Sequence, residues 1–150
     1  MGQSLVKNFL HIVFSTKNRE PLIQPPYENE LHAYLGGICN NNDCIPVKIS
    51  GHTDHVHLLV LLSKKVTLVK LVGEVKLHSS KWMKTKDDKL KNFYWQNGYG
   101  AFSINPTEIK VVKNYIQNQE EHHKKKSFQD EYRIFLNKYN VEYDEHYVWD

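Results

Sequence analysis

Two histidines are spaced so that both imidazole rings could reach one point. They lie in residues 51–60, which read GHTDHVHLLV. Side chains alternate across a β-strand, so His55 and His57 share one face, and the apolar residues Val56, Leu58 and Val60 share the other. Neutral imidazole nitrogens are common metal ligands, so the pair predicts a site for a divalent cation. The competing interpretation is two surface histidines on an edge strand, although a central strand rarely carries two unpaired polar side chains without a use.

A second group of residues has the spacing of one face of a helix. Tyr115 and Gln119 are four positions apart and therefore lie on the same face, and His122 falls in the same sector. Beside them runs a stripe of apolar residues that predicts the buried side of the helix: Ile109, Val112 and Ile116. The same pattern also fits a partly buried tyrosine with a hydrated hydroxyl and a glutamine on the surface.

Together these residues suggest a nucleophilic reaction assisted by a metal. A tyrosine hydroxyl has a pKa of about 10 and attacks poorly at neutral pH unless a cation polarises its target or a base takes its proton. A metal bound by His55 and His57 could polarise a phosphate. The amide oxygen of Gln119 could be its third ligand, which would place Tyr115 one helical turn away. Two neighbours are candidates for orienting these groups: His122 and Asp54.

At these residues the chain resembles the single-tyrosine HUH transposases of the smallest bacterial insertion sequences. These IS200-like proteins include relatives associated with repetitive extragenic palindromes. The HUH motif, His-hydrophobic-His, corresponds to His55-Val56-His57, and the family's Tyr-x-x-x-Gln signature corresponds to Tyr115 and Gln119. The resemblance spans nearly the whole chain and includes further stretches: HIVFSTK at 11–17, residues 51–59, WQNGYGAFS at 95–103 and HHKK at 122–125.

The resemblance implies a DNA transposase that cuts and rejoins single-stranded DNA. Tyr115 would attack a phosphodiester, form a covalent 5′-phosphotyrosine link and free a 3′-hydroxyl for later rejoining. His55, His57 and Gln119 would hold Mg²⁺ or Mn²⁺, which binds the scissile phosphate. Imidazole is not the usual ligand of Mg²⁺, so weak metal binding assisted by the substrate is expected, with Mn²⁺ working as well or better.

The same resemblance implies how the DNA and the subunits are arranged. The DNA is expected to be recognised as a hairpin, from palindromic ends near the cut. In the mobile-element branch the protein is a homodimer, in which the tyrosine helix of one subunit can complete the histidine site of the other. In the palindrome-associated branch a monomer is the alternative.

A basic stretch is the sequence's candidate for binding the DNA backbone. It consists of Lys81, Lys84, Lys86, Lys89 and Lys91. The alternative is a solvated helix end and loop. Three aromatic residues could stack on bases or pack in the core: Trp82, Trp95 and Tyr99.

These side chains need elements that bring them to one side of a sheet. Strands are expected at 9–15, 44–50, 55–62 and 93–104, the last broken at 97–100, and helices at 27–40 and 67–84. A final helix is expected from Asn105, with Pro106 at its first position and Glu108 in a capping box, to about His123. This order predicts an α+β fold of the ferredoxin-like split βαβ type, with a central antiparallel sheet, helices on one face and an added C-terminal tyrosine-bearing helix.

Composition limits the class of protein. With 40% hydrophobic and 25% charged residues and no apolar run long enough to span a membrane, the chain is expected to be cytoplasmic. Cys39 and Cys44 lack the spacing of a zinc or redox site and are expected to pack in the core. Residues 127–150 carry six acids and two bases, a net charge of −4. Because the whole chain has a net charge of +3, residues 1–126 carry +7.

The resemblance implies an HUH nuclease domain at 1–126, and the acidic residues 127–150 form a C-terminal extension expected to pack on the same domain. The acidic extension could compete with DNA for the basic body, a hypothesis that fails if deleting 127–150 leaves DNA affinity unchanged or lowers it. Two other functions stay open beside strand transfer. One is a DNA-hairpin-binding protein without catalysis, and the other is a metal-dependent nuclease in which water attacks the phosphate.

Overall fold

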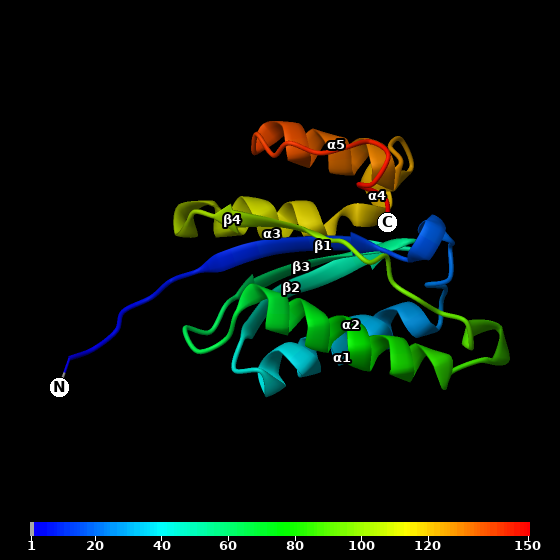
Figure 1. The fold of residues 1–150 in the computed structure, drawn as a ribbon, viewed down its shortest axis with the longest axis horizontal. Helices are drawn as coiled ribbons and strands as arrows, with labels where there is room; N and C mark the ends of the chain where they lie inside the picture. Colours follow the sequence, from blue (N-terminus) through cyan, green and yellow to red (C-terminus); the bar gives the residue numbers. More distant parts are fainter. Residues whose placement is uncertain (1) are drawn as a thin grey trace.

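A computed structural model describes residues 2–150 and shows one antiparallel sheet with helices on both faces (Figure 1). The strands are β1 (Phe9–Ser15), β2 (Ile45–His52), β3 (His55–Leu61) and β4 (Gly100–Ile104). The helices are α1 (Tyr27–Asn41), α2 (Leu68–Lys84), α3 (Ile109–Gln117), α4 (Gln119–His123) and α5 (Phe128–Lys138). Three short 3₁₀ turns are η1 (Lys17–Arg19), η2 (Asp88–Leu90) and η3 (Pro106–Glu108).

The strand order β2-β3-β1-β4 confirms the predicted ferredoxin-like sheet. Each neighbouring pair is antiparallel, and α1 joins β1 to β2 across the intervening β3. As expected, α1 and α2 lie together on one face (Figure 1). The tyrosine-bearing α3 lies on the opposite face together with α4 and α5, so both faces of the sheet are covered.

Alternation along the two central strands separates a core from a polar face. Val56, Leu58 and Val60 of β3 belong to the main core, with residues of β1, α1 and α2. The alternate residues of β3 point to the other face, where α3 packs over Leu59. Both histidines therefore lie under the C-terminal helices rather than under α1 and α2.

The β2–β3 hairpin fixes the place where the histidine strand begins. The two strands pair from His52 and His55, which leaves Thr53 and Asp54 as the connecting residues. The Asp54 carbonyl accepts a hydrogen bond from the Thr16 backbone N–H at 2.8 Å. A Cβ at Gly51 would lie 2.2 Å from the His55 carbonyl oxygen, so only glycine permits this close approach.

The expected continuous helix from Asn105 to His123 is wrong. Asn105 does cap the segment, since its side chain accepts from the Thr107 N–H at 3.0 Å, but η3 and α3 follow and α3 ends at Gln117. At Asn118 the backbone leaves the helical region (φ −98°, ψ 28°), and α4 begins at the next residue. Asparagine is a poor residue for a helix interior because its side chain competes for backbone hydrogen bonds.

Other expected boundaries differ by small amounts. Cys44 precedes β2, and the predicted strand 93–104 contains only β4 and an isolated bridge between Trp95 and Thr16. Cys39 and Cys44 are free, buried and part of the main core, which confirms their packing role. None of the helices described in residues 2–150 is long and apolar enough to cross a membrane.

Candidate metal centre and nucleophile

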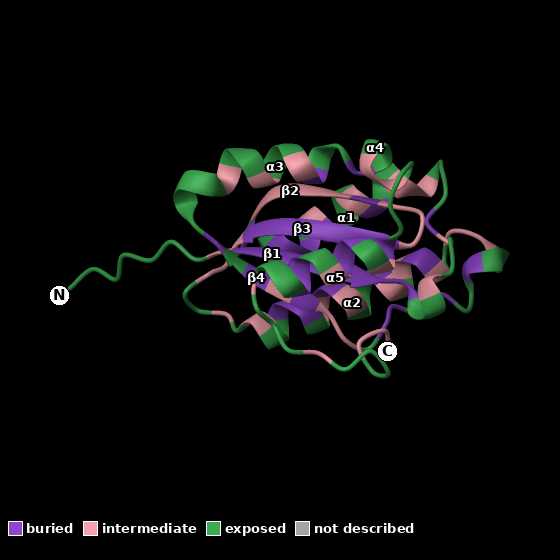
Figure 2. Cartoon of the chain, turned by 90° about the horizontal axis from the view of Figure 1, so that it is seen from above, coloured by how far each residue is buried: buried purple, intermediate pink, exposed green. Residues whose placement is uncertain are grey.

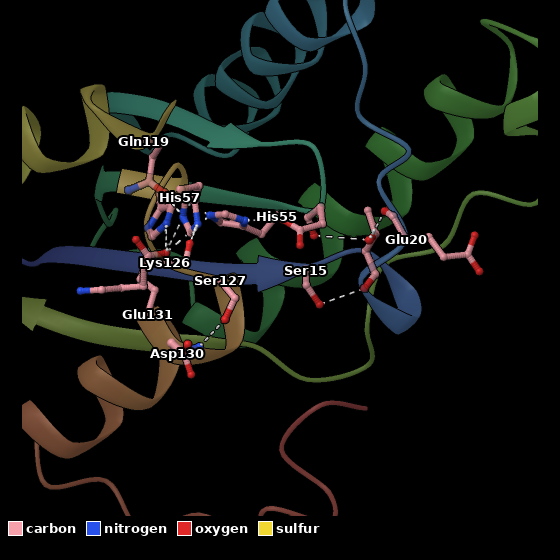
Figure 3. Close-up of polar contacts among 12 residues, drawn as sticks. Ser15, Glu20, His55, His57, Gln119, Lys126, Ser127, Asp130 and Glu131 are labelled. Atoms are coloured by element: carbon pink, nitrogen blue, oxygen red, sulfur yellow. Dashed lines mark hydrogen bonds and ion pairs between the residues drawn. The ribbon is translucent and has the colours of Figure 1, made fainter. Parts of the chain in front are cut away.

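His55 and His57 are completely buried, and their rings lie side by side with centroids 5.0 Å apart. They come from alternate positions of β3 and point toward α4 and α5. Figure 3 shows them turned toward Gln119 and Glu131, with dashed lines converging between these side chains. The predicted sharing of one strand face therefore brings the two imidazoles to one point.

Each of these two histidines has a hydrogen-bonding partner on its Nδ1 atom. Nδ1 of His55 lies 2.7 Å from Oδ1 of Asp54, and Nδ1 of His57 lies 2.7 Å from Nε2 of His11. A carboxylate can only accept, so the proton of neutral His55 sits on Nδ1, which leaves Nε2 free to bind a metal. Such partners orient ligands and raise their basicity.

Glu131 occupies the middle of the cluster. Its Oε1 lies 2.9 Å from Nε2 of His57, 3.3 Å from Nε2 of His123 and 3.5 Å from Nε2 of His55. The Glu131 side chain comes from α5 and is only 1% exposed. Ligand atoms of His55, His57, His123 and Glu131 all lie within 4.8 Å of one another. A buried group of three imidazoles and one carboxylate could hold a divalent metal ion.

Gln119 also faces this cluster. Its Oε1 lies 3.1 Å from Nε2 of His55 and 2.9 Å from Nε2 of His123, and the whole side chain is buried. The break at Asn118 turns α4 so that Gln119 and His123, one helical turn apart, meet the histidine strand. Its amide oxygen is therefore available beside the carboxylate, as a ligand of the kind that Mg²⁺ and Mn²⁺ accept.

Tyr115 reaches the same cluster from α3 of its own chain. Its hydroxyl donates a hydrogen bond to Oε2 of Glu131. The Tyr115 ring stacks on His122, with centroids 4.4 Å apart, and meets the edge of Phe135 at 5.6 Å. The tyrosine is thus fixed next to the imidazoles, with its hydroxyl pointing into the cluster.

The charges inside this site are strongly coupled. Burial lowers the pKa of His57, a change that Glu131 partly opposes. Burial alone would raise the pKa of Glu131, but hydrogen bonds from His123 and His57 hold it far below its usual range. Burial and the negative charge of Glu131 raise the pKa of Tyr115, so the hydroxyl stays protonated at neutral pH in the metal-free protein.

The structure therefore brings together most of the residues singled out in the sequence: His55, His57, Tyr115, Gln119 and Asp54. His122 lies against the ring of Tyr115 and is not one of the groups that converge on a metal position. His11, His123 and Glu131 were missed. A signal for Glu131 existed, because it falls in the apolar stripe of α5, which consists of Phe128, Tyr132, Phe135 and Leu136.

The predicted basic stretch lies elsewhere. Lys81 and Lys84 are in α2, on the sheet face opposite the histidines, and the other three lysines follow in the next loop (Figure 1). Lys84 lies over the Tyr94 ring at 4.2 Å, and Lys86 pairs with Glu30 at 3.0 Å. Trp95 is buried in the core and Tyr99 packs against it, whereas Trp82 stacks on the half-exposed Tyr34 at 4.9 Å.

A comparison with family models gives the family of this chain, and comparisons with solved structures give its fold. Residues 5–119 match the family model described as transposase IS200 like. A protein described as a candidate transposase from Deinococcus radiodurans R1 shares the fold with a TM-score of 0.62 and 22% identity, over 79% of this chain and 96% of that one. A REP-associated tyrosine transposase bound to a REP hairpin shares the fold with a TM-score of 0.61 and 15% identity, over 82% of this chain and 73% of that one. No curated protein matches.

Proposed function

The chain belongs to the IS200-like transposase family, and from that premise we propose that it cuts and rejoins single-stranded DNA through a 5′-phosphotyrosine on Tyr115. One observation carries the proposal. The Tyr115 hydroxyl donates a hydrogen bond to Glu131, which belongs to a buried cluster of three histidines and a glutamate that could hold a metal. A nucleophile next to candidate metal ligands is the arrangement that phosphoryl transfer by a tyrosine needs.

The proposed reaction is a reversible exchange of phosphodiester bonds. The Tyr115 hydroxyl gives up its proton as its oxygen attacks the scissile phosphorus; a new O–P bond forms, the bond to the 3′-oxygen of the upstream nucleotide breaks, and that oxygen takes up a proton. That oxygen leaves as a 3′-hydroxyl, while the 5′-phosphate stays on the tyrosine. Glu131 accepts the hydrogen bond of the hydroxyl and His122 stacks on the ring, so both orient the nucleophile before attack.

We propose that Mg²⁺ or Mn²⁺ binds at His55, His57 and Gln119, with Glu131 and His123 as further ligands. When bound, the metal polarises the scissile phosphate and stabilises the charge that develops on it. The donor set fits such an ion because it combines imidazole nitrogens with a carboxylate and an amide oxygen. Its three imidazoles favour Mn²⁺ over Mg²⁺, which prefers oxygen ligands.

The proposed substrate is single-stranded DNA with a hairpin next to the cut, in line with the REP hairpin bound to one structural relative. The basic stretch on α2 and the loop after it is our candidate for the DNA backbone. Tyr115 is linked to His55 and His57 of its own chain through Glu131, which contacts all three side chains. A homodimer with the tyrosine helices exchanged between subunits stays a prediction. We further propose that residues 1–126 form the nuclease domain and that 127–150 is an extension packed on it.

A covalent capture experiment tests the proposal. The protein is incubated with Mn²⁺ and a labelled pool of single-stranded DNA hairpins that have varied stems and randomised single-stranded flanks, then resolved on a denaturing gel. We expect a covalent protein–DNA band that Tyr115→Phe abolishes. Tyr147→Phe, at a residue that is 65% exposed, is the matched control and keeps the band. Cleavage that survives Tyr115→Phe would indicate a nuclease that uses water, and hairpin binding without cleavage would indicate a binding protein.

A further inference from the structure

A hollow of about 210 Å³ opens beside the catalytic tyrosine. It lies between α3 and α5, which cross the same face of the sheet, α3 along β2 and α5 over β1 and β4 (Figure 2). Val111 of α3 and Ile134 of α5 line it and are 63% and 48% exposed, so they mark its mouth. His11 and Glu131 also line it but are buried, so they mark its floor. The hollow therefore leads from the surface to the reacting groups.

The walls of this hollow suit a flat apolar ring. Between mouth and floor they are formed by Phe135 and Tyr139 on one side and by Val112 and Tyr115 on the other. Pockets for drug-sized molecules usually enclose roughly 300–1,000 Å³. The smaller volume here fits a single ring system rather than a whole nucleotide, and aromatic side chains are the surfaces on which nucleobases stack.

Two lysine side chains also line this hollow. Lys126 and Lys138 both line it and both are exposed. Neither ammonium pairs with a carboxylate among residues 2–150, whereas Lys124 and Arg133 nearby are paired with acids. An apolar hollow with unpaired ammonium groups complements a nucleotide, whose base is apolar on its faces and whose phosphates are anionic.

We propose that this hollow takes the base of the nucleotide next to the scissile phosphate, with Lys126 and Lys138 on the neighbouring backbone phosphates. The inference rests on the proposed function, because it is attack by Tyr115 that brings a flanking nucleotide to this position. Tyr115 supplies the nucleophile and also lines the hollow. A base bound in the hollow therefore determines which phosphate of the strand lies next to the Tyr115 hydroxyl. α5 is then part of the DNA site and contributes to the choice of cut.

The test fills the hollow from each wall. Val111→Trp and Ile134→Trp place a large ring at the mouth, and both residues are exposed enough to tolerate it. Val69→Trp, near the start of α2, is the matched control, since this residue is 72% exposed and is not part of the hollow. The DNA is the hairpin pool described above, followed by single hairpins with an abasic site at each position flanking the mapped cut. Covalent adduct and hairpin affinity by mobility shift are both measured.

We expect an abasic site at one flanking position to lower adduct formation by the wild-type protein about tenfold, within the range that stacking of one base produces. Filling the hollow should lower the adduct on intact DNA by a similar factor, remove the sensitivity to the abasic site and leave the affinity for the same hairpins without their single-stranded flanks unchanged. The Val69→Trp control should behave as wild type. The inference is overturned if neither abasic position matters, or if the filled variants match this control. Absence of any wild-type adduct would instead overturn the proposed function.

Discussion

Replacing Glu131 by glutamine removes the central charge of the candidate metal site while keeping its shape. In the metal-free protein Oε1 of Glu131 contacts three imidazoles at 2.9–3.5 Å and Oε2 accepts from Tyr115. Hydrogen bonds to a charged group contribute about 1.5–3 kcal/mol each, and the amide can retain only part of this. We expect metal-free Glu131→Gln to lose about 2 kcal/mol of stability, or roughly 4–8 °C in Tm for a chain of this size.

The larger effect should be on metal binding. If Glu131 is a ligand, the variant should bind Mn²⁺ about 100-fold more weakly, the upper end of the cost of losing a group that supports a metal site. At a Mn²⁺ concentration 100 times the wild-type Kd, the metal stabilises the wild type by about 2.7 kcal/mol. The same concentration stabilises the variant by about 0.4 kcal/mol. The Tm increase caused by Mn²⁺ should therefore fall from roughly 5–11 °C to about 1–2 °C.

Thermal unfolding with and without Mn²⁺, together with titration calorimetry, measures both quantities. Asp130→Asn is the matched control, because this neighbouring acid of α5 is exposed, contacts Arg133 and does not touch the site. An unchanged Mn²⁺ affinity in Glu131→Gln would refute the assignment of Glu131 as a ligand. If the variant also formed more covalent adduct than the wild type, the carboxylate would be an obstacle to the phosphate rather than a support for the metal.

Three further predictions follow from buried groups. His11→Leu should weaken Mn²⁺ binding about tenfold, because His57 loses the partner of its Nδ1, and His11→Gln should restore part of it; equal affinities would show that His11 only packs. Burial lowers the pKa of His32 to about 4, so the unfolded chain takes up the proton first and stability falls as the pH drops below about 6.5. His32→Gln should reduce the loss of stability between pH 7 and pH 5 by about 1–2 kcal/mol, after allowance for partial exposure, as measured by urea unfolding. An unchanged dependence of the unfolding free energy on pH would contradict this. Burial, together with Cys44, raises the pKa of the Cys39 thiol to about 12. Iodoacetamide at pH 8 should therefore label Cys39 only after unfolding. Rapid labelling of Cys39 in the native protein would disprove its assignment as a buried core residue.

Local periodicity predicted the strands, the helices as far as α3 and the histidine pair, but it did not predict α5 (Phe128–Lys138). Alternation in β3 placed His55 and His57 on one face, because strand geometry depends only on residues next to each other in sequence. Side chains four apart also predicted that Tyr115 and Gln119 would be neighbours, and both reach the cluster although the helix breaks between them at Asn118. The fold followed from the order of these elements.

Residues that enter the site from distant segments could not be predicted in the same way. His11 and Glu131 meet His57 across 46 and 74 positions, and such contacts depend on how whole elements pack. Each left a weaker trace in the sequence. His11 is a polar residue inside the buried strand FLHIVFS, and Glu131 is an acid on the apolar side of α5. An ionisable residue at a core position needs a partner. Both residues could therefore have been marked as candidate site residues, although the sequence does not indicate their roles.

The position of α5 changes what the acidic tail can mean. Of the tail's acids, Glu131 is the one that enters the candidate metal site, while Asp130 and Glu145 are paired with Arg133 at the surface. The aromatic stripe of α5 packs on Val13 and Phe102 of the sheet. A Cβ at Gly100 would lie 2.6 Å from the Tyr132 ring, so the strand and the helix are fitted closely together. Deleting residues 127–150 would thus uncover part of the core and remove a candidate ligand at once. Competition between the tail and DNA is therefore better tested by substituting single charges of α5 than by truncation.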